Sequence, residues 1–252
     1  MGRKARLRAT NRDRRRAGPR PQDETGWQVV GLHESETTMG PDVVSADVET
    51  VLAAVRNAPR GDDWPALQRL VIPMLPRVRP QPPGVPPPLR RILPPGIAVG
   101  FGADIGPALM LMTAAQCGAL GITEDELISQ SLANLVGRAE QLDPGLVFRD
   151  HDGEVSIAAL QTGQSIAAAL VLVPDQVARL FGPRPAVLLT PMRDLMLGLP
   201  PDVDPELAAW WFDAFASQDP NHLAPVAYRF DGHAIAPIAL GASLISARRL
   251  DA

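Results

Sequence analysis

Cysteine and aromatic residues are scarce in this chain of 252 residues, which has one cysteine and an aromatic fraction of 4%. The single cysteine, Cys117, excludes an intrachain disulfide, and no secretory hydrophobic region follows Met1. Both absences favour the cytoplasm as the location of the protein. With so few aromatic rings, the core is expected to pack mainly from alanine, leucine and valine side chains.

Long uninterrupted apolar runs are also lacking. Residues 105–123 and 155–174 contain no charged side chain, and each approaches the roughly 20 apolar residues that span a bilayer. Glycine and glutamine residues interrupt both stretches, which makes them too polar for the bilayer interior. We therefore expect no membrane span.

The four histidines, His33, His151, His222 and His233, stand singly in the sequence. None has a Cys, Asp or Glu at the spacing of a known metal site, and the chain has neither a nucleophile elbow nor a Walker loop. Cys117 has an apolar helical setting that favours an inert, packed thiol. The sequence therefore predicts no catalytic residue, no metal and no cofactor.

Charge is divided unevenly along the chain. Residues 1–22 hold nine of the 24 basic and one of the 28 acidic residues, so this segment carries +8 and the remainder carries −12. Such composition predicts a disordered basic arm over 1–46. Nonspecific nucleic-acid association by residues 1–22 through counterion release is one hypothesis, and a solvated tail is the alternative.

The rest of the chain divides into four parts by its periodicity and proline content. Helical spacing predicts a helical segment over 47–79, and proline density predicts an extended linker over 80–96. The linker contains PxxP spacings typical of SH3 ligands, but such spacings occur in any proline run, so we favour a stiff spacer. An α+β domain is expected over 97–241, followed by a flexible C-terminal end over 242–252.

The domain opens with two predicted strands, IAVGFGAD and PALMLM, joined by a glycine-containing turn. The stretch GFGADIG invites comparison with a dinucleotide-binding loop, but its third glycine comes one residue late for GxGxxG. We therefore interpret it as a turn.

Two helices with capping boxes follow, one from Thr113 with Gln116 and one from Thr123 with Glu126. Their spacing resembles a helix-turn-helix, but the first turn of the second helix is acidic, which argues against DNA binding. That helix is predicted to bury one apolar face, made of Leu127, Ile128, Leu132, Leu135 and Val136.

Two hairpins are predicted around Asp152-Gly153 and Asp231-Gly232, and the turn at Asp152-Gly153 is expected to be of type I′. Between them lie a helix in PDQVARLFG, an apolar strand AVLLT and a helix that Asp204 caps. Because strands and helices do not alternate strictly, the fold class is α+β, with a mixed or antiparallel sheet built from hairpins and packed helices.

A polar pair, Arg193 and Asp194, follows the apolar strand AVLLT. Strand ends are places where functional side chains gather, so both residues are candidates for a binding site. An enzyme would need acid or base groups around one cavity, for instance this pair with His151 or His233.

Three passages are similar to the YtpQ-like family of bacterial proteins of unknown function. They are GITEDELISQSLANL, SIAAALVLVPDQVARLF and AVLLTPMRDLML, in the family's order between residues 97 and 238. The resemblance implies a cytosolic α+β fold and no catalytic residues. Asn134, in the Asn-Leu pair of the first passage, joins Arg193 and Asp194 as a binding candidate.

These observations together predict a cytoplasmic, non-catalytic binding or interaction protein with an unknown partner. The alternatives are an enzyme with a polar site near Arg193 and Asp194, and nucleic-acid association through the arm.

Overall fold

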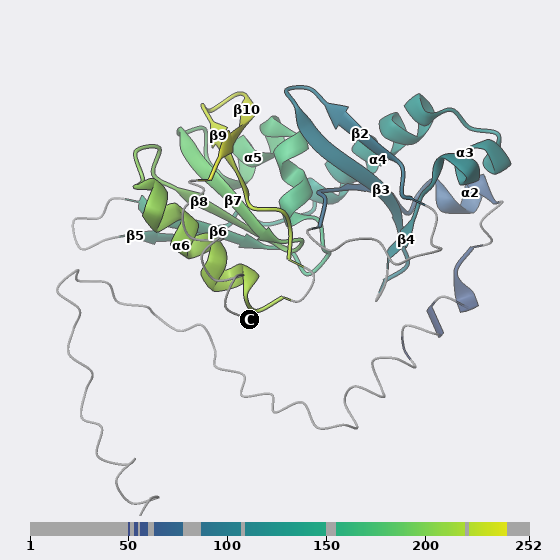
Figure 1. Ribbon diagram of the computed structural model, residues 1–252, viewed down its shortest axis with the longest axis horizontal. Helices are drawn as coiled ribbons and strands as arrows, with labels where there is room; N and C mark the ends of the chain where they lie inside the picture. Colours follow the sequence, from purple (N-terminus) through teal and green to yellow (C-terminus); the bar gives the residue numbers. More distant parts are fainter. Residues whose placement is uncertain are drawn as a thin grey trace, which may run out of the picture.

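The computed structural model describes residues 50, 53–54, 56–59, 63–77, 87–106, 109–149, 155–219 and 222–240. Two antiparallel sheets lie side by side with helices packed on and between them (Figure 1). The predicted α+β class is confirmed. The predicted arm over 1–46 and C-terminal end over 242–252 lie outside the described residues, as do residues 78–86 of the proline-rich region.

The larger sheet has six strands in the order β10-β9-β7-β8-β6-β5, and every neighbouring pair is antiparallel. Both predicted hairpins belong to it, as β5 with β6 and β9 with β10. Its strands are β5 (Leu146–Arg149), β6 (Val155–Gln161), β7 (Ala186–Met192), β8 (Leu195–Leu199), β9 (Val226–Phe230) and β10 (Ile235–Ala239).

The turn between β9 and β10 differs from the prediction. Gly232 has a φ of 104°, whereas Asp231 and His233 have no positive φ. Asp231 N–H donates to the carbonyl of Ala234 over 3.1 Å, so Gly232 and His233 are the two central residues. A positive φ at the first central residue alone is the pattern of a type II′ turn, and the central pair lies one residue later in the chain than the predicted pair Asp231-Gly232. The other predicted turn, at Asp152-Gly153, lies outside the described residues.

The smaller sheet is built around the long strand β3. Strand β1 pairs with one edge of β3, while β2 and β4 share the other edge. Its strands are β1 (Val71–Met74), β2 (Arg90–Leu93), β3 (Ile97–Asp104) and β4 (Leu109–Leu111).

Strands β1 and β2 correct the expected division of the chain. The described residues of 50–57 are helical, as predicted. In the second half of the expected helical segment, a separate short helix ends at Leu67 and strand β1 follows it. Its β-branched Val71 and Ile72 are fully buried, and Pro73 is tolerated because β1 is an edge strand. Strand β2 lies within the expected linker over 80–96. The α+β unit therefore begins well before residue 97.

Two glycines of the GFGADIG stretch, Gly100 and Gly102, lie inside β3 rather than in a turn. A Cβ atom at Gly102 would come within 3.1 Å of the carbonyl oxygen of Met110 and of the Met74 side chain. Close packing inside the sheet thus explains Gly102. Only Gly106 belongs to the connection between β3 and β4, which agrees with the predicted turn.

The predicted helix starts are confirmed. Thr113 and Thr123 both form complete capping boxes, and Asp204 caps a helix that has Pro205 in its first turn. Gly121 ends the first of these helices in the left-handed conformation. The helices are α2 (Trp64–Leu67), α3 (Ala114–Leu120), α4 (Glu124–Ala139), the 3₁₀ helix η2 (Ala167–Leu172), α5 (Pro174–Phe181) and α6 (Pro205–Ala216).

The buried stripe of α4 is narrower than predicted. Leu127, Ser131, Leu135 and Ala139 are buried at a spacing of four residues. The other predicted core positions, Ile128, Leu132 and Val136, are only partly buried. Small Ser131 and Ala139 let α4 approach β1 and η2 closely.

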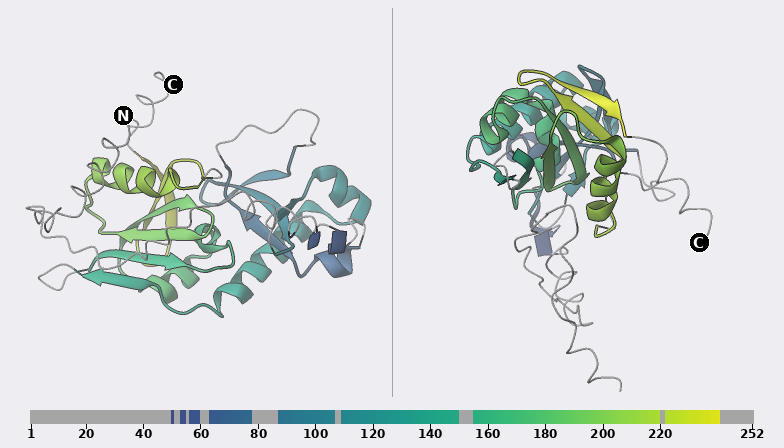
Figure 2. Two further views of the ribbon diagram at one scale, coloured as in Figure 1. Left: turned by 90° about the horizontal axis from the view of Figure 1, so that it is seen from below. Right: turned by 90° about the vertical axis from the view of Figure 1, so that its left-hand side faces the viewer.

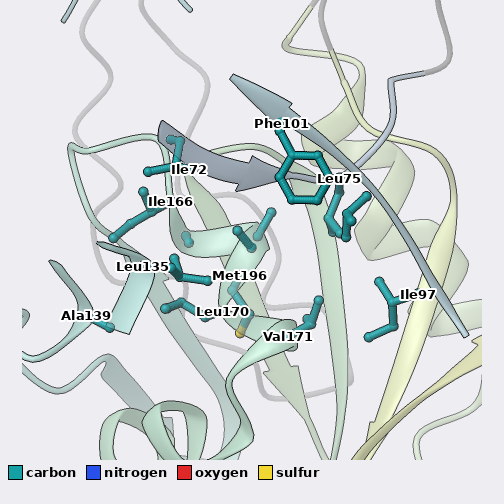
Figure 3. Packing of buried hydrophobic residues seen from close by; sticks show 14 of the residues in the cluster. Ile72, Leu75, Ile97, Phe101, Leu135, Ala139, Ile166, Leu170, Val171 and Met196 are labelled. Atoms are coloured by element: carbon teal, nitrogen blue, oxygen red, sulfur yellow. The ribbon is translucent and has the colours of Figure 1, made fainter. Parts of the chain in front are cut away.

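Helices cover the two faces of the six-stranded sheet differently. Helix α6 packs on one face over β7, β8 and β9, while η2 and α5 pack on the other (Figures 1 and 2). The core on the η2 side continues into the smaller sheet, so that Phe101 of β3 and Met196 of β8 belong to one cluster that also contains Leu135 and Leu170 (Figure 3). The two sheets therefore share a core. In the described part of the chain, no helix combines the length and apolarity needed to cross a membrane.

Candidate functional site

Asp194, one of the predicted site residues, lies in the tight turn between β7 and β8. Its carboxylate accepts hydrogen bonds from the backbone N–H of Gly163 over 2.8 Å and of Ser165 over 2.9 Å, and from the Thr162 hydroxyl. Ser165 has a φ of 58°, a backbone conformation that residues other than glycine rarely adopt. Asp194 therefore holds the loop after β6 in place, and its acceptors are occupied by the fold.

Asn134 likewise serves the fold. Its side-chain amide donates to the carbonyl of Gln68 over 2.7 Å and to that of Val71 over 2.8 Å, while its oxygen accepts from Gln130 over 2.9 Å. These bonds connect α4 to the start of β1. Both amide protons are used, so Asn134 is not available for a ligand without breaking a contact of the core.

Arg193 lies where three segments meet. Its carbonyl accepts from Ala168 N–H of η2 over 3.0 Å. Leu223 N–H donates to the carbonyl of Pro191, at the end of β7, and Leu223 also forms an isolated β-bridge with Arg77. The end of the β1 segment, the chain before β9 and the β7–β8 turn are thus adjacent, and Arg193 stands at this junction.

The guanidinium group of Arg193 has no partner among the residues that the structure describes. It forms no hydrogen bond or ion pair with any residue that the structure describes, and its buried Nε is the one buried side-chain donor or acceptor left unsatisfied in that part. Burial, followed by the charge of Arg77, lowers the pKa of Arg193 to about 10, against the opposing effects of Asp219 and Asp104. Arg193 is therefore a partly buried cation whose guanidinium has no hydrogen-bond acceptor among the described residues.

A separate groove of about 800 Å³ lies at the end of the larger sheet. Its floor comes from β6 and β8, and its walls come from β5, from the loop over 182–186 and from the start of α6. Among the described residues that line it, the apolar ones are Val147, Ile157, Ala158, Phe181, Pro183, Pro185, Ala186, Leu199, Pro200, Pro201, Val203, Leu207 and Trp211.

The polar side chains of the groove are two arginines and two aspartates, Arg149, Arg184, Asp202 and Asp204. Asp204 is occupied because it accepts from Glu206 N–H over 2.8 Å at the start of α6. Arg184 and Asp202 are exposed and form no ion pair or hydrogen bond with the described residues. In the described lining no Ser, Thr, Cys, His, Lys or Tyr is found, and most of the lining side chains are apolar, as is common in binding grooves.

The edge strand β5 continues the groove outward. All four of its residues are exposed, among them three consecutive large apolar side chains, with exposed fractions of 70% for Leu146, 45% for Val147 and 42% for Phe148. Because β5 ends the strand order, one of its edges has no strand partner within the described sheet. An apolar strand at a sheet edge is a common docking surface for an extended polypeptide.

The convergence expected of an enzyme is not found among the described residues. Arg193 and Asp194 line neither the groove nor a second, shallow cavity of about 570 Å³ beside Trp64 and α4. His233 is exposed at the β9–β10 turn, and His151 lies outside the described residues. Cys117 is buried, which raises the pKa of its thiol. No group of three or more potential metal ligands occurs in the described ranges.

The groove was not predicted from the sequence. The groove depends on the β7–β8 hairpin and on the placement of α6, and β8 was not predicted because it is buried on both faces and shows no alternation. The one sequence signal of this groove was the apolar run in LVFR, which was interpreted only as one strand of a hairpin.

No protein-family model matches the chain, and neither a curated protein nor a solved structure matches it significantly.

Proposed function

We propose that this chain is a cytoplasmic, non-catalytic binding protein that holds an extended apolar segment of a partner protein along β5 and in the adjoining groove. The observation that carries the proposal is the exposed run Leu146, Val147 and Phe148 on an edge strand that opens into the groove. An added strand would pair with the β5 backbone, and the groove would take one of its side chains. The resemblance to the YtpQ-like family remains a prediction.

Charge at the groove narrows the partner further. Arg184 and Asp202, both exposed and without a described partner, stand on two loops that line the groove, one before β7 and one after β8. A segment with an apolar centre, an acidic residue facing Arg184 and a basic residue facing Asp202 would satisfy both. Trp211 offers a large aromatic surface of the kind that supplies most of the affinity at protein interfaces.

The experiment is selection of peptides from a random library on the full chain, followed by anisotropy measurements with the labelled peptides. We expect enriched sequences to alternate or cluster apolar residues, and Val147→Glu to weaken their binding about tenfold or more, because a carboxylate would be desolvated in the interface. The matched control is Ile92→Glu, at a residue of β2 that is 76% exposed and belongs to the other sheet.

Equal affinities for the wild type and Val147→Glu, with Ile92→Glu also unchanged, would contradict the proposal. So would a selection that enriches no peptide. Thermal unfolding of both variants shows whether each remains folded, which is expected because both positions are exposed.

A further inference from the structure

Helix α6 presents a large aromatic side chain to solvent. The inner side of the helix packs on the larger sheet, and its buried residues are Ala208, Ala209, Phe212 and Ala216. Trp210, on the outer side, is 55% exposed, although burial of an indole ring contributes strongly to stability. Trp210 therefore offers an apolar surface that the described fold does not cover.

This surface is continuous with the groove. The ring of Trp211, which lines the groove, meets the ring of Trp210 edge-on, with the centroids 5.1 Å apart and 76° between the ring planes. Trp211 is itself stacked on Phe215, with the centroids 5.9 Å apart and 14° between the planes. Leu207, one helical turn before Trp210, is 42% exposed and also lines the groove. The apolar surface of the groove thus extends along α6, and Trp211 supports the Trp210 ring.

Two carboxylates flank Trp210 on the helix surface. Glu206 precedes it by four residues and Asp213 follows it by three, and both spacings place side chains next to each other on a helix. Neither carboxylate forms an ion pair or a hydrogen bond with the residues that the structure describes. The sequence between Asp194 and Tyr228 contains no Lys or Arg, so α6 and its flanking loops supply no cation of their own.

The place of Asp213 in the helix makes this charge unfavourable. Asp213 lies in the last turn of α6, where the helix dipole disfavours a negative charge, and that turn contains no basic residue. A cation held beside Asp213 and Glu206 would offset this effect. It would also contact the face of an indole ring, which attracts cations more strongly than the other aromatic side chains do.

We propose that the outer side of α6, formed by Glu206, Trp210 and Asp213, binds an arginine of the partner segment whose apolar part occupies the groove. This inference rests on the peptide-binding function proposed above and adds a specific residue to the partner. An arginine fits better than a lysine, because its planar guanidinium stacks on an indole ring while its N–H groups remain directed at carboxylates. The basic end of the segment then lies on the side of the groove that α6 forms.

The test uses peptides selected from the random library on the full chain. We expect the enriched sequences to carry an arginine beside their apolar run. Anisotropy gives the Kd of a labelled peptide and of the same peptide with citrulline, a neutral analogue, in place of the arginine. Both the citrulline exchange and Trp210→Ala should weaken binding about tenfold, as expected for an arginine paired with a tryptophan at an interface.

A double-mutant cycle separates a direct contact from a structural effect. Trp210→Ala should bind the arginine and citrulline peptides with Kd values within about threefold of each other, because the ring that the guanidinium contacts is absent. A merely structural effect of the substitution would weaken both peptides alike.

The carboxylates provide variants that also serve if Trp210→Ala does not fold. Glu206→Gln and Asp213→Asn should each weaken the arginine peptide about two- to fivefold and leave the citrulline peptide unchanged. The matched control is Asp125→Asn, at an exposed carboxylate of α4, the helix that packs on the smaller sheet. Its Kd values should equal those of the wild type.

The outcomes distinguish this inference from the proposed function. Enriched peptides without arginine, or an equal loss of both peptides in Trp210→Ala, overturn the inference, while weakened binding in Val147→Glu still supports the groove. A chain that sediments alone as a dimer, and as a monomer after Trp210→Ala, also overturns it, because a second copy then covers the ring. A selection that enriches no peptide contradicts both.

Discussion

The side-chain amide of Asn134 donates a hydrogen bond of 2.8 Å to the carbonyl of Val71, which lies 63 residues earlier in the chain. A second bond of 2.7 Å reaches the carbonyl of Gln68, so one residue of α4 satisfies two carbonyls at the entrance to β1. This contact fixes α4 against the smaller sheet. It also explains why an asparagine occurs in a helix, where its intrinsic propensity is low.

Replacing Asn134 should therefore lower stability. We expect Asn134→Ala to cost about 1 to 3 kcal/mol in the free energy of unfolding, because two carbonyl groups lose their donor. Asn134→Asp should cost more at neutral pH, since a carboxylate would face two carbonyl oxygens, and part of this loss should be recovered in acid as the carboxylate is protonated. Urea denaturation at two pH values measures both effects.

The control is Ser129→Ala, at an exposed position on the same helix. It should be neutral or slightly stabilising because alanine favours the helix. If Asn134→Asp is as stable as the wild type at neutral pH, the two donor bonds are not those described.

Asp194 gives a second prediction for the turn between β7 and β8. Asp194→Ala should destabilise the protein by about 2 kcal/mol, since charge-assisted hydrogen bonds to Gly163, Ser165 and Thr162 are lost together. The loop after β6 should then show faster amide hydrogen exchange, which mass spectrometry can localise. Asp202→Ala, at an exposed aspartate without a described partner, should change stability by less than about 0.5 kcal/mol. Equal effects of the two substitutions would contradict this assignment.

Local signals in the sequence predicted what local interactions determine. The capping boxes at Thr113 and Thr123 and the cap at Asp204 involve residues at most three positions apart, so their residue types alone predict the helix starts. The alternation in VAYRF likewise predicted β9 correctly.

Elements that depend on distant partners were not predictable in the same way. The sequence VIPM has too few residues to distinguish helix from strand, and it becomes β1 because β3 pairs with it. Arg193, Asp194 and Asn134 were chosen for their polarity, but polarity does not reveal which of them the fold itself occupies. Asp194 is bonded to Thr162, and Asn134 is bonded to Val71. Only these contacts distinguish the two structural residues from Arg193.

Gly232 tests the type II′ turn between β9 and β10. Its φ of 104° is unfavourable for any side chain, and an added Cβ would come within 2.5 Å of the carbonyl oxygen of Pro183. We expect Gly232→Ala to cost at least about 2 kcal/mol. Gly118→Ala is the matched control, because Gly118 lies within α3 with open space around it, and alanine there should stabilise by about 0.5 to 1 kcal/mol. Opposite shifts in the denaturation midpoint are the expected outcome, and a stabilising Gly232→Ala would contradict the turn geometry.

Tyr228 is the only tyrosine of the chain, so its ionisation can be followed without interference from another phenol. The Tyr228 side chain, which projects from β9 into the core, is buried, and this burial raises its pKa to about 12. A side-chain hydrogen bond with Thr190 acts in the opposite direction. We expect the tyrosinate absorbance of the native protein to appear with a midpoint near pH 12, about two units above that of a free phenol. Unfolded protein in urea should titrate near pH 10.

The same shift makes stability depend on pH. Below about pH 10 the phenol is neutral in both the folded and the unfolded state, so its burial contributes in full to the stability of the protein. Between about pH 10 and 12 the unfolded state loses its phenolic proton while the folded state keeps it, so stability falls by about 2 to 3 kcal/mol as pH rises. Tyr228→Phe should remove this part of the alkaline decline. Thr190→Val should raise the folded pKa of Tyr228 further, because the hydroxyl that stabilises the phenolate is absent.

The prediction is contradicted if the tyrosinate absorbance of the native wild type appears with a midpoint near pH 10. Such a midpoint would show that the phenol is exposed.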